Sequence, residues 1–355
     1  MTVKSALDSG AAKVLIVTFG EKNMNEAKRT CGELIDDAVG RLAVLDNRVG
    51  FKRSQMLLGV QETNTEITVF CDDHVFWPEG FLESILAPFE DEEMGGVGMH
   101  KRVKRVCSLW KPNLQNFFGC IYLERHNAEI LATNRLDGGV FIISSRSAAY
   151  RTAILKDSKF QEAFLNEHVN FPFVGPRGPL NADDDNFMMR WLVTHNKKIW
   201  IQNGPEALML TTINNSWGKF LSQLLRWART TWRSNPRSIM EGKVMRTQYW
   251  SFYSTNLSLN FNFAAAWDPV LLLTLHCATL DLSHHRRALI CMVVWILFSK
   301  IVKLIPHFRR NPGDIALFPV YVLGALLHSF IKLWALFTAH DIAWGSRSNV
   351  DQVAK

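Results

Sequence analysis

Three groups of polar residues have the types and spacing that phosphate and hydroxyl chemistry requires. The first, Asp72, Asp73 and His74, directly follows the apolar run Glu66–Phe70. If that run is a strand of a parallel sheet, its carboxylates lie at the edge where α/β folds bind ligands. A hard divalent cation that bridges two phosphates prefers such oxygen ligands. The pair therefore predicts a metal and diphosphate site, with a simple Asp-rich turn as the alternative.

The second group, Asp183–Asp185, stands between the Pro/Gly-rich loop Phe171–Leu180 and the helical run Asn186–Thr194. Crowded carboxylates raise one another's pKa, which suits a general base that takes a proton from an acceptor hydroxyl. A helix N-terminus also tolerates anions, so capping alone is the alternative explanation. Together with the first group, the sequence predicts separate metal and base sites.

The third group, Gln223, Arg226 and Trp227, lies on a predicted helix from about Lys219 to Arg233. Residues one helical turn apart share a face, so amide, guanidinium and indole can meet one diphosphate and an acceptor sugar. The same helix mixes apolar and basic residues as a membrane-surface helix does. The two interpretations are compatible.

The elements that must position these groups alternate between strand and helix, which favours a parallel α/β sheet. Apolar runs predict strands at Lys13–Phe19, Arg41–Leu45, Glu66–Phe70 and Gly138–Ser144. Helical spacing predicts helices at Asn25–Ile35, Arg53–Val60, Gly80–Phe89 and Ser147–Leu155. The basic stretch Lys101–Arg105 could hold an anionic lipid or a diphosphate, but a solvated edge is the expectation, and the stretch is given no site role.

Composition restricts the class of protein. The chain has 355 residues, 48% of them hydrophobic, with 12 Trp, 23 Phe and a net charge of +7. Such a composition excludes a disordered or fibrous chain. The six cysteines form no CxxC pair, so neither a disulfide framework nor a zinc cage is indicated. No nucleic-acid partner is expected.

The apolar residues concentrate towards the C-terminus. Three runs are each long enough to cross a bilayer of about 30 Å, near Leu257–Leu280, Ala288–Ile305 and Ile315–Ala339. Polar residues interrupt the first run, so it is expected to be part interfacial helix and part span. A soluble domain followed by a membrane module is predicted.

In chain order, the motifs resemble those of the processive family-2 glycosyltransferases, which include cellulose, chitin and hyaluronan synthases. The similarity is greatest to the fungal polysaccharide-synthase-like branch and extends from about Lys13 to Arg347. It is carried by Asp72–Pro78 (DDHVFWP), Leu86–Asp91 (LAPFED), Ala148–Arg151 (AAYR), Ala182–Asp184 (ADD), Gln223–Trp227 (QLLRW) and Trp344–Arg347 (WGSR).

The resemblance implies a GT-A-type, Rossmann-like α/β catalytic domain that uses a UDP-sugar and Mg²⁺ or Mn²⁺. It implies that Asp73 is the metal ligand and Asp184 the general base, with Asp183 and Asp185 beside it. The implied donor and diphosphate contacts are Lys52, Arg53, Asp72, Gln223, Arg226 and Trp227. Trp344 and Arg347 are expected either at the mouth of a polymer channel or as anchors of the last helix at the membrane interface.

Two departures from the family pattern stand out. Cys71 occupies the position of the first carboxylate of the family's DxD motif. The chain also begins at what would be the family's second strand, so the uracil-gripping first strand and a membrane anchor are expected to be missing. The expected organisation is a catalytic domain over 1–212, interfacial amphipathic helices over 213–250, transmembrane helices over 251–340 and a tail over 341–355.

The expected function is that of a membrane-bound inverting hexosyltransferase which extends a β-linked polysaccharide of a cell wall or extracellular glycan. One alternative is a non-processive enzyme that glycosylates a lipid or lipophilic metabolite. Another is a shortened, catalytically silent membrane partner. The protein is expected to be integral and multi-pass, in contact with membrane lipids, with its catalytic domain facing the cytosol at the plasma membrane.

Overall fold

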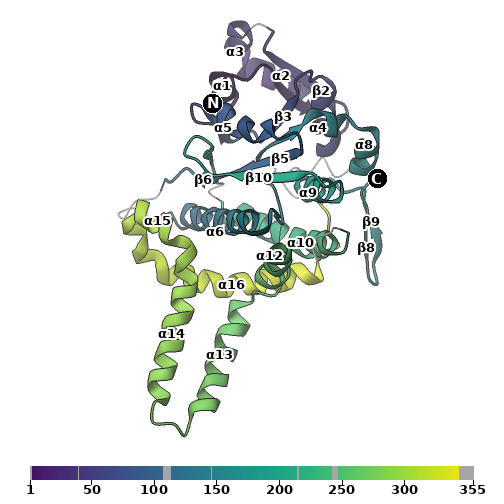
Figure 1. Cartoon of the computed structure of the whole chain (residues 1–355). Helices are drawn as coiled ribbons and strands as arrows, with labels where there is room; N and C mark the ends of the chain where they lie inside the picture. Colours follow the sequence, from purple (N-terminus) through teal and green to yellow (C-terminus); the bar gives the residue numbers. More distant parts are fainter. Residues whose placement is uncertain are drawn as a thin grey trace.

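The computed structural model describes residues 2–38, 40–106, 113–144, 146–213, 216–241 and 247–343. An α/β region occupies one end of the molecule, and a group of helices lies beneath it (Figure 1). The N-terminal elements are α1 (Thr2–Asp8), β1 (Val14–Phe19), α2 (Glu21–Thr30), α3 (Gly32–Asp37), β2 (Leu42–Asn47), α4 (Lys52–Gln61) and β3 (Ile67–Cys71). The predicted strands up to Cys71 and the helix Arg53–Val60 are thus confirmed within a few residues, whereas the predicted helix Asn25–Ile35 is divided between α2 and α3 at Cys31.

The strands form a mixed rather than an all-parallel arrangement. β1 and β2 pair in parallel, and a separate sheet has the order β10-β5-β7-β3, in which β7 is antiparallel to β3 and β5. A small sheet has the order β4-β11-β6, and β8 and β9 form a hairpin. The bounds are β4 (Val75–Phe76), β5 (Met94–Met99), β6 (Lys101–Val103), β7 (Ser147–Arg151), β8 (Val169–Phe171), β9 (Gly175–Arg177), β10 (Lys198–Gln202) and β11 (Met209–Thr211).

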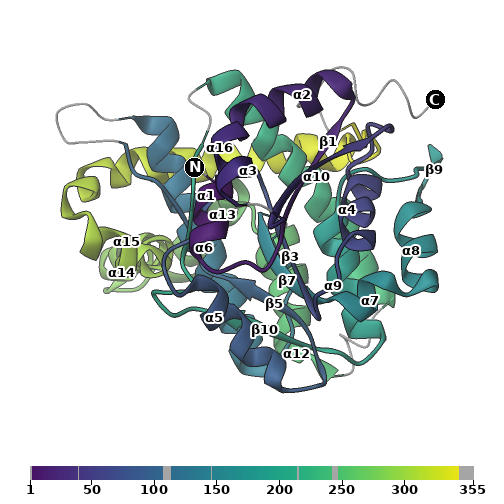
Figure 2. The ribbon, with the colours of Figure 1, turned by 90° about the horizontal axis from the view of Figure 1, so that it is seen from above.

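Helices cover these sheets and contribute many of the buried apolar side chains of the core. They are α5 (Phe81–Leu86), a 3₁₀ turn (Ala87–Glu90), α6 (Leu114–Asp137), α7 (Thr152–Lys156), α8 (Ser158–Leu165) and α9 (Asp184–Thr194). The main apolar cluster joins α4, α8 and α9 to β7 and β10, with Phe160, Phe164 and Ile201 fully buried. This packing fixes the first turn of α9 against the sheet. Figure 2 looks down on the layer, where β3, β7, β5 and β10 follow one another.

The segment from Gly138 to Arg151 differs from its prediction. Gly138 ends α6 in the left-handed conformation, and the apolar run after it is buried without forming a strand in its described residues. A short apolar run indicates burial and cannot by itself separate strand from irregular chain. Ser147–Arg151, predicted as helix, forms β7 because pairing with both β3 and β5 overrides its local preference.

The edges of β1 and β3 are open. Among the described residues, β1 pairs only with β2 and β3 pairs only with β7. Consecutive residues of both strands line the same cavity, although both strands are apolar and only partly buried. Backbone N–H and C=O groups of two facing strand edges are therefore left without sheet partners there.

The C-terminal third is helical, but its helices do not match the three spans that the sequence predicted. Its elements are α10 (Trp217–Glu241), α12 (Tyr249–Tyr253), a π-helix (Ser254–Asn260), α13 (Ala264–Thr279), α14 (His285–Ile301), a 3₁₀ turn (Val302–Leu304), α15 (Ile305–Arg310), a second 3₁₀ turn (Pro312–Leu317) and α16 (Phe318–Phe337). Among the described residues, two helical segments, His285–Arg310 and Pro312–Phe337, are long and apolar enough to cross a bilayer.

The first predicted span, Leu257–Leu280, is not one continuous helix. The π-helix ends at Asn260, and α13 begins four residues later and has only 16 residues. Buried polar contacts hold the break, because Asn235 donates to the Asn260 side chain and Lys332 donates to the Asn262 carbonyl. α13 and α14 form a hairpin that projects away from the α/β region, while α16 runs across its base against α10 (Figure 1).

Candidate active site

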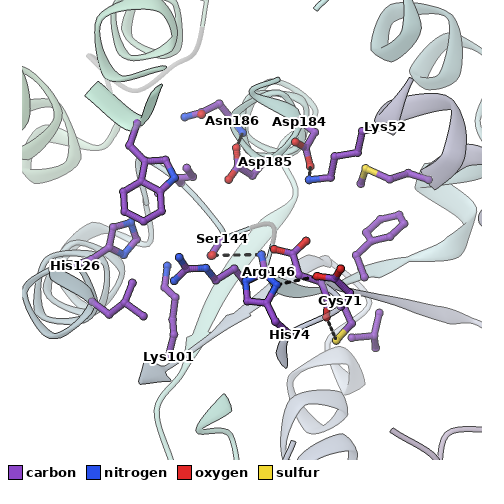
Figure 3. A pocket seen from close by; sticks show the side chains of 18 of the residues that line it. Lys52, Cys71, His74, Lys101, His126, Ser144, Arg146, Asp184, Asp185 and Asn186 are labelled. Carbon is purple, nitrogen blue, oxygen red and sulfur yellow. Dashed lines mark hydrogen bonds and ion pairs between the residues drawn. The ribbon is translucent and has the colours of Figure 1, made fainter. Parts of the chain in front are cut away.

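A cavity of about 2050 Å³ brings most of the predicted residues together. It opens at the carboxyl ends of β1 and β3, passes α9 and α10, and continues between α6 and the C-terminal helices. Its lining includes Lys52, Asp72, Asp73, Asp183, Asp184, Asp185, Gln223, Arg226 and Trp227. The sequence spacing alone could not show that these segments, of which the first and last lie 175 residues apart along the chain, meet. Figure 3 shows part of this cavity.

Asp184 lies in the first turn of α9 and faces a cation. Its Oδ2 atom is 2.8 Å from Lys52 Nζ, and the carboxylate is almost fully buried. Burial opposes the charge on Lys52, but Asp184, Asp72 and Asp185 outweigh it and raise the pKa of Lys52 above its usual value. The helix N-terminus also favours the carboxylate. Asp184 thus lies at the cavity wall in contact with Lys52, and it would be available to a hydroxyl if Lys52 released it.

Asp183 has a different set of contacts from its neighbours. It adopts φ 61° and directs its carboxylate onto Arg233 of α10, with Nε–Oδ2 and Nη2–Oδ1 distances of 2.6 and 2.9 Å. Thr230 and Ser234 also donate to it. Burial raises the pKa of Asp183, but Arg233 and these hydrogen bonds outweigh burial and lower it to about 2. Asp183 therefore ties α9 to α10 and is saturated by protein partners, so its predicted place beside the base as a catalytic group is not supported.

Arg53 does not lie in the cavity. Its side chain is fully buried and donates to Glu167 and to the carbonyls of Phe164 and Ala182. Glu167 also pairs with Arg190 and Arg237, so it joins α4, α9 and α10. The predicted donor contact by Arg53 is wrong, because a guanidinium enclosed in this network cannot reach a nucleotide. Its neighbour Lys52 points into the cavity instead.

The carboxylates after β3 lie at the cavity rim. Asp73 Oδ1 is 2.8 Å from His74 Nδ1, and the Asp73 side chain is 81% exposed. The pKa of the Cys71 thiol is raised to about 12, because the site desolvates the thiolate and Asp72 and Asp73 repel it. Cys71 therefore stays a neutral thiol, which is a poor ligand for a hard cation.

The residues present fit a divalent cation only in part. The described part of the chain contains no cluster of three or more His, Cys, Asp or Glu side chains that could hold an ion. Mg²⁺ and Mn²⁺ in nucleotide sites commonly use one or two carboxylates, with phosphate oxygens and water completing the shell. Asp72 and Asp73 match that smaller requirement at the sheet edge.

The residues on α10 face the acidic groups. Burial lowers the pKa of Arg226, whereas Asp184, Asp185 and Asp72, which line the same cavity, act to raise it. Trp227 stacks on Tyr122 of α6 with ring centroids 4.7 Å apart. The predicted convergence of this helix on the acidic cluster is present in the fold.

Three basic residues to which the sequence analysis gave no site role also line the cavity. Lys101, expected at a solvated edge, is only 3% exposed, while Arg102 beside it points to the opposite side of β6. Arg146 is 7% exposed and His126 comes from α6. Strand β6 is not among the strands predicted from the sequence. Because side chains alternate between the two faces of a strand, predicting it would have placed Lys101 and Val103 on the inner face. Trp344 and Arg347, predicted at a channel mouth, lie outside the described residues.

Comparison with known proteins gives the wider context. The model of a family described as "Glycosyltransferase like family 2" matches residues 1–230. A type 2 glycosyltransferase of Pyricularia oryzae is 40% identical over 99% of this chain and 71% of its own length. A type 2 glycosyltransferase of Gibberella zeae is 38% identical over 99% of this chain, which spans 65% of that relative's length.

Among solved structures, a mannosyltransferase from Pyrobaculum calidifontis in complex with GDP-Man and Mn²⁺ is similar with a TM-score of 0.46 and 16% identity. The match covers 84% of this chain and 83% of the mannosyltransferase chain.

Proposed function

Because this chain belongs to the glycosyltransferase like family 2, we propose that it is a membrane-bound inverting enzyme that transfers sugar from a UDP-sugar to a growing β-linked polysaccharide. The observation that carries the proposal is the meeting of Lys52, Asp184 and Arg226 with the Asp72–Asp73 edge in one cavity. Such a site offers a base on one side and cationic groups for a leaving diphosphate on the other.

In the proposed reaction, Asp184 takes the proton of the acceptor hydroxyl as that oxygen attacks the anomeric carbon. The bond from that carbon to the diphosphate breaks, and Arg226 and Lys52 stabilise the negative charge that develops. Asp72 and Asp73 would hold Mg²⁺ or Mn²⁺, which supplies further charge neutralisation to the diphosphate when bound. Lys52 would pass from Asp184 to a phosphate oxygen, freeing the base only when donor is present.

The test is a transfer assay on purified membranes with Mn²⁺ and a panel of radiolabelled UDP-sugars. We expect Asp184→Asn to lower turnover by about 10²-fold or more, because it removes the base. Asp91→Asn is the matched control, since Asp91 pairs with Lys198 at the surface. Equal turnover of wild type and Asp184→Asn would exclude the assigned base.

A second candidate is a non-processive enzyme that acts on a lipid or lipophilic metabolite. It is favoured by the continuation of the cavity past α6 to Ser299, Ala325 and His328 of the apolar C-terminal helices. Product size separates the two, because a processive enzyme gives long chains and a single transfer gives one defined product.

The third candidate, a catalytically silent partner, depends on the open edges of β1 and β3. If the site needs an extended segment between these strands to grip the nucleotide base, residues 1–355 alone would bind the donor weakly. The same assay decides this, because turnover by this chain alone excludes the silent partner.

We also propose how the molecule sits in a membrane. The side chains of Leu323, Leu327, Phe330, Trp334 and Phe337 are 61–68% exposed along one face of α16. The opposite face carries buried Tyr321, Ser329 and Lys332, of which Tyr321 and Lys332 line the cavity. An apolar face of this kind is typical of a helix lying in the interface. In this arrangement the α13–α14 hairpin enters the bilayer, and α16 is not a third span.

A further inference from the structure

The β8–β9 hairpin ends in an exposed apolar tip that the proposed transfer does not use. Its strands pair Val169–Phe171 with Gly175–Arg177, and Pro172, Phe173 and Val174 form the loop between them. The Phe173 side chain is fully exposed and Val174 is 38% exposed. Phe173 also adopts φ 69°, in the left-handed region where glycine or asparagine is the usual residue. A strained aromatic residue that leaves its ring in water points to a binding role for this tip.

The base of the β8–β9 hairpin is fixed to the α/β region. The Leu180 N–H, just after β9, donates to the Glu167 carbonyl, just before β8, at 2.8 Å. The next residue, Asn181, accepts at Oδ1 from the Lys52 N–H of α4 at 2.7 Å. Because both ends of the hairpin are tied to buried parts of the fold, the tip has a defined place relative to the cavity.

The tip lies near the end of the helix that we propose to rest in the membrane interface. The ring centroid of Phe171 is 6.5 Å from that of His340, which follows soon after the end of α16 at Phe337. Figure 1 shows the β8–β9 hairpin extending from the α/β region in the same direction as the α13–α14 hairpin and reaching the level of α16. Figure 2 shows β9 at the outer edge of the molecule. The tip is therefore continuous with the apolar face of α16, at a distance from the α13–α14 hairpin.

Exposed aromatic side chains occur on the same side of the molecule. Tyr249, Trp250 and Tyr253 of α12, which lies level with α16 in Figure 1, are 43–72% exposed, and Trp267 near the start of α13 is 52% exposed. Tyr and Trp are enriched where a protein meets the membrane–water interface. These side chains, the α16 face and the β8–β9 tip are spread around the apolar α13–α14 hairpin. A lipid bilayer, being flat and extended, can contact all of them at once.

We propose that the tip of the β8–β9 hairpin, Pro172–Val174, inserts into the interface of a lipid bilayer as a separate membrane contact of this chain. The inference rests on the proposed function, because it takes the enzyme to be membrane-bound. The Phe173 ring enters the boundary between headgroups and acyl chains, and the exposed Arg177 of β9 faces anionic headgroups. With the α13–α14 hairpin, this second contact fixes the tilt of the α/β region over the membrane surface.

The test uses a fluorescent reporter beside an intact Phe173. The dye NBD is attached to Val174→Cys in the full chain, with the native cysteines replaced by serine, in vesicles of phosphatidylcholine and phosphatidylserine. We expect lipid-attached nitroxides to quench this reporter and aqueous iodide not to reach it. Phe173→Ser should shift the tip about tenfold or more towards water, because it removes the buried aromatic side chain.

Two control variants make the comparison specific. Phe173→Trp should keep the tip inserted, and Leu136→Ser, which removes an exposed apolar side chain from α6, should leave the reporter unchanged. Thermal melting confirms that all variants are folded. A reporter that iodide reaches and lipid nitroxides do not quench overturns the inference.

Two further outcomes separate this inference from the proposed function. A reporter shielded from both quenchers shows that protein covers the tip, and it also overturns the inference. NBD on Phe337→Cys of α16 tests the proposed membrane arrangement by itself. If Phe337→Cys is quenched by lipid nitroxides and Val174→Cys is not, only the role of the β8–β9 hairpin fails. If neither is quenched, the proposed position of α16 in the membrane fails as well.

Discussion

At the scale of single residues, the neighbouring aspartates Asp183 and Asp184 make different contacts although they are the same type of residue. Asp184 faces Lys52 in the cavity, whereas Asp183 is enclosed by Arg233, Thr230 and Ser234. The difference follows from one left-handed residue at the start of α9, which turns the Asp183 side chain towards α10. Such a contact is expected to contribute to stability and not to proton transfer.

The Asp183–Arg233 pair gives a prediction with a defined pH range. The folded pKa of Asp183, about 2, lies below the usual value of about 3.9 for an unfolded chain. The pair therefore contributes its full stability above about pH 4 and loses it as the pH falls towards 2. We expect Asp183→Asn to lower the free energy of unfolding by about 3–5 kcal/mol at neutral pH, because it leaves a buried guanidinium without its counter-charge.

Denaturant unfolding of the detergent-solubilised chain between pH 7 and 2 measures both effects. Asp91→Asn, which breaks an exposed pair with Lys198, is the control and should leave the free energy of unfolding nearly unchanged, because water screens an exposed ion pair. An Asp183→Asn variant as stable as wild type, with the same loss of stability below pH 4, would contradict the role given to this pair.

At the scale of elements, the open edges of β1 and β3 are the most unusual feature of the sheet. β5 lies between β10 and β7, while β1 and β3 each have one strand neighbour among the described residues. The amide groups on an unpaired edge exchange with water unless another segment covers them. The edges also border the cavity, so what covers them would complete its wall.

Hydrogen exchange followed by mass spectrometry tests whether the unpaired edges of β1 and β3 are exposed to water. Peptides from β1 and β3 should exchange at least about tenfold faster than peptides from β5, because part of their amides have no sheet partner. Addition of UDP and Mn²⁺ should slow exchange in β3, whose end carries Asp72, more than in β10. Protection of β1 equal to that of β5 would show that its free edge is covered in solution.

At the scale of the whole molecule, the arrangement of the apolar helices bears on how the proposed membrane-bound enzyme would sit in a bilayer. The hairpin of α13 and α14 points away from the α/β region and α16 crosses its base (Figure 1). Three parallel spans would put the C-terminus on the side opposite the catalytic domain. A two-helix hairpin with a flat α16 keeps both on the same side.

Depth measurements distinguish the two arrangements. Nitroxide labels on Leu323→Cys, Phe330→Cys and Phe337→Cys, with the native cysteines replaced by serine, should report nearly equal depths in lipid vesicles if α16 lies flat. If α16 spans, their depths should differ by about 20 Å, because these 14 intervals each rise about 1.5 Å. A label at Val294 of the hairpin should be deeper than all three, and Leu136→Cys, exposed on α6, should be in water.

The sequence by itself determined the strand and helix order up to Cys71, the three polar groups and their likeness to a glycosyltransferase family. Those features depend on local periodicity and short motifs, which one chain segment carries alone. Tertiary structure decided that Arg53 is structural, that Asp183 faces Arg233, that Ser147–Arg151 is a strand and that Lys101 is a cavity residue. Arg53 and Asp183 depend on partners more than 45 residues away in the chain, Glu167 and Arg233. Ser147–Arg151 depends on pairing with β3 and β5, and Lys101 depends on which side of its sheet faces the cavity. Local patterns cannot contain that information, because the free energy of burial and pairing belongs to both partners together.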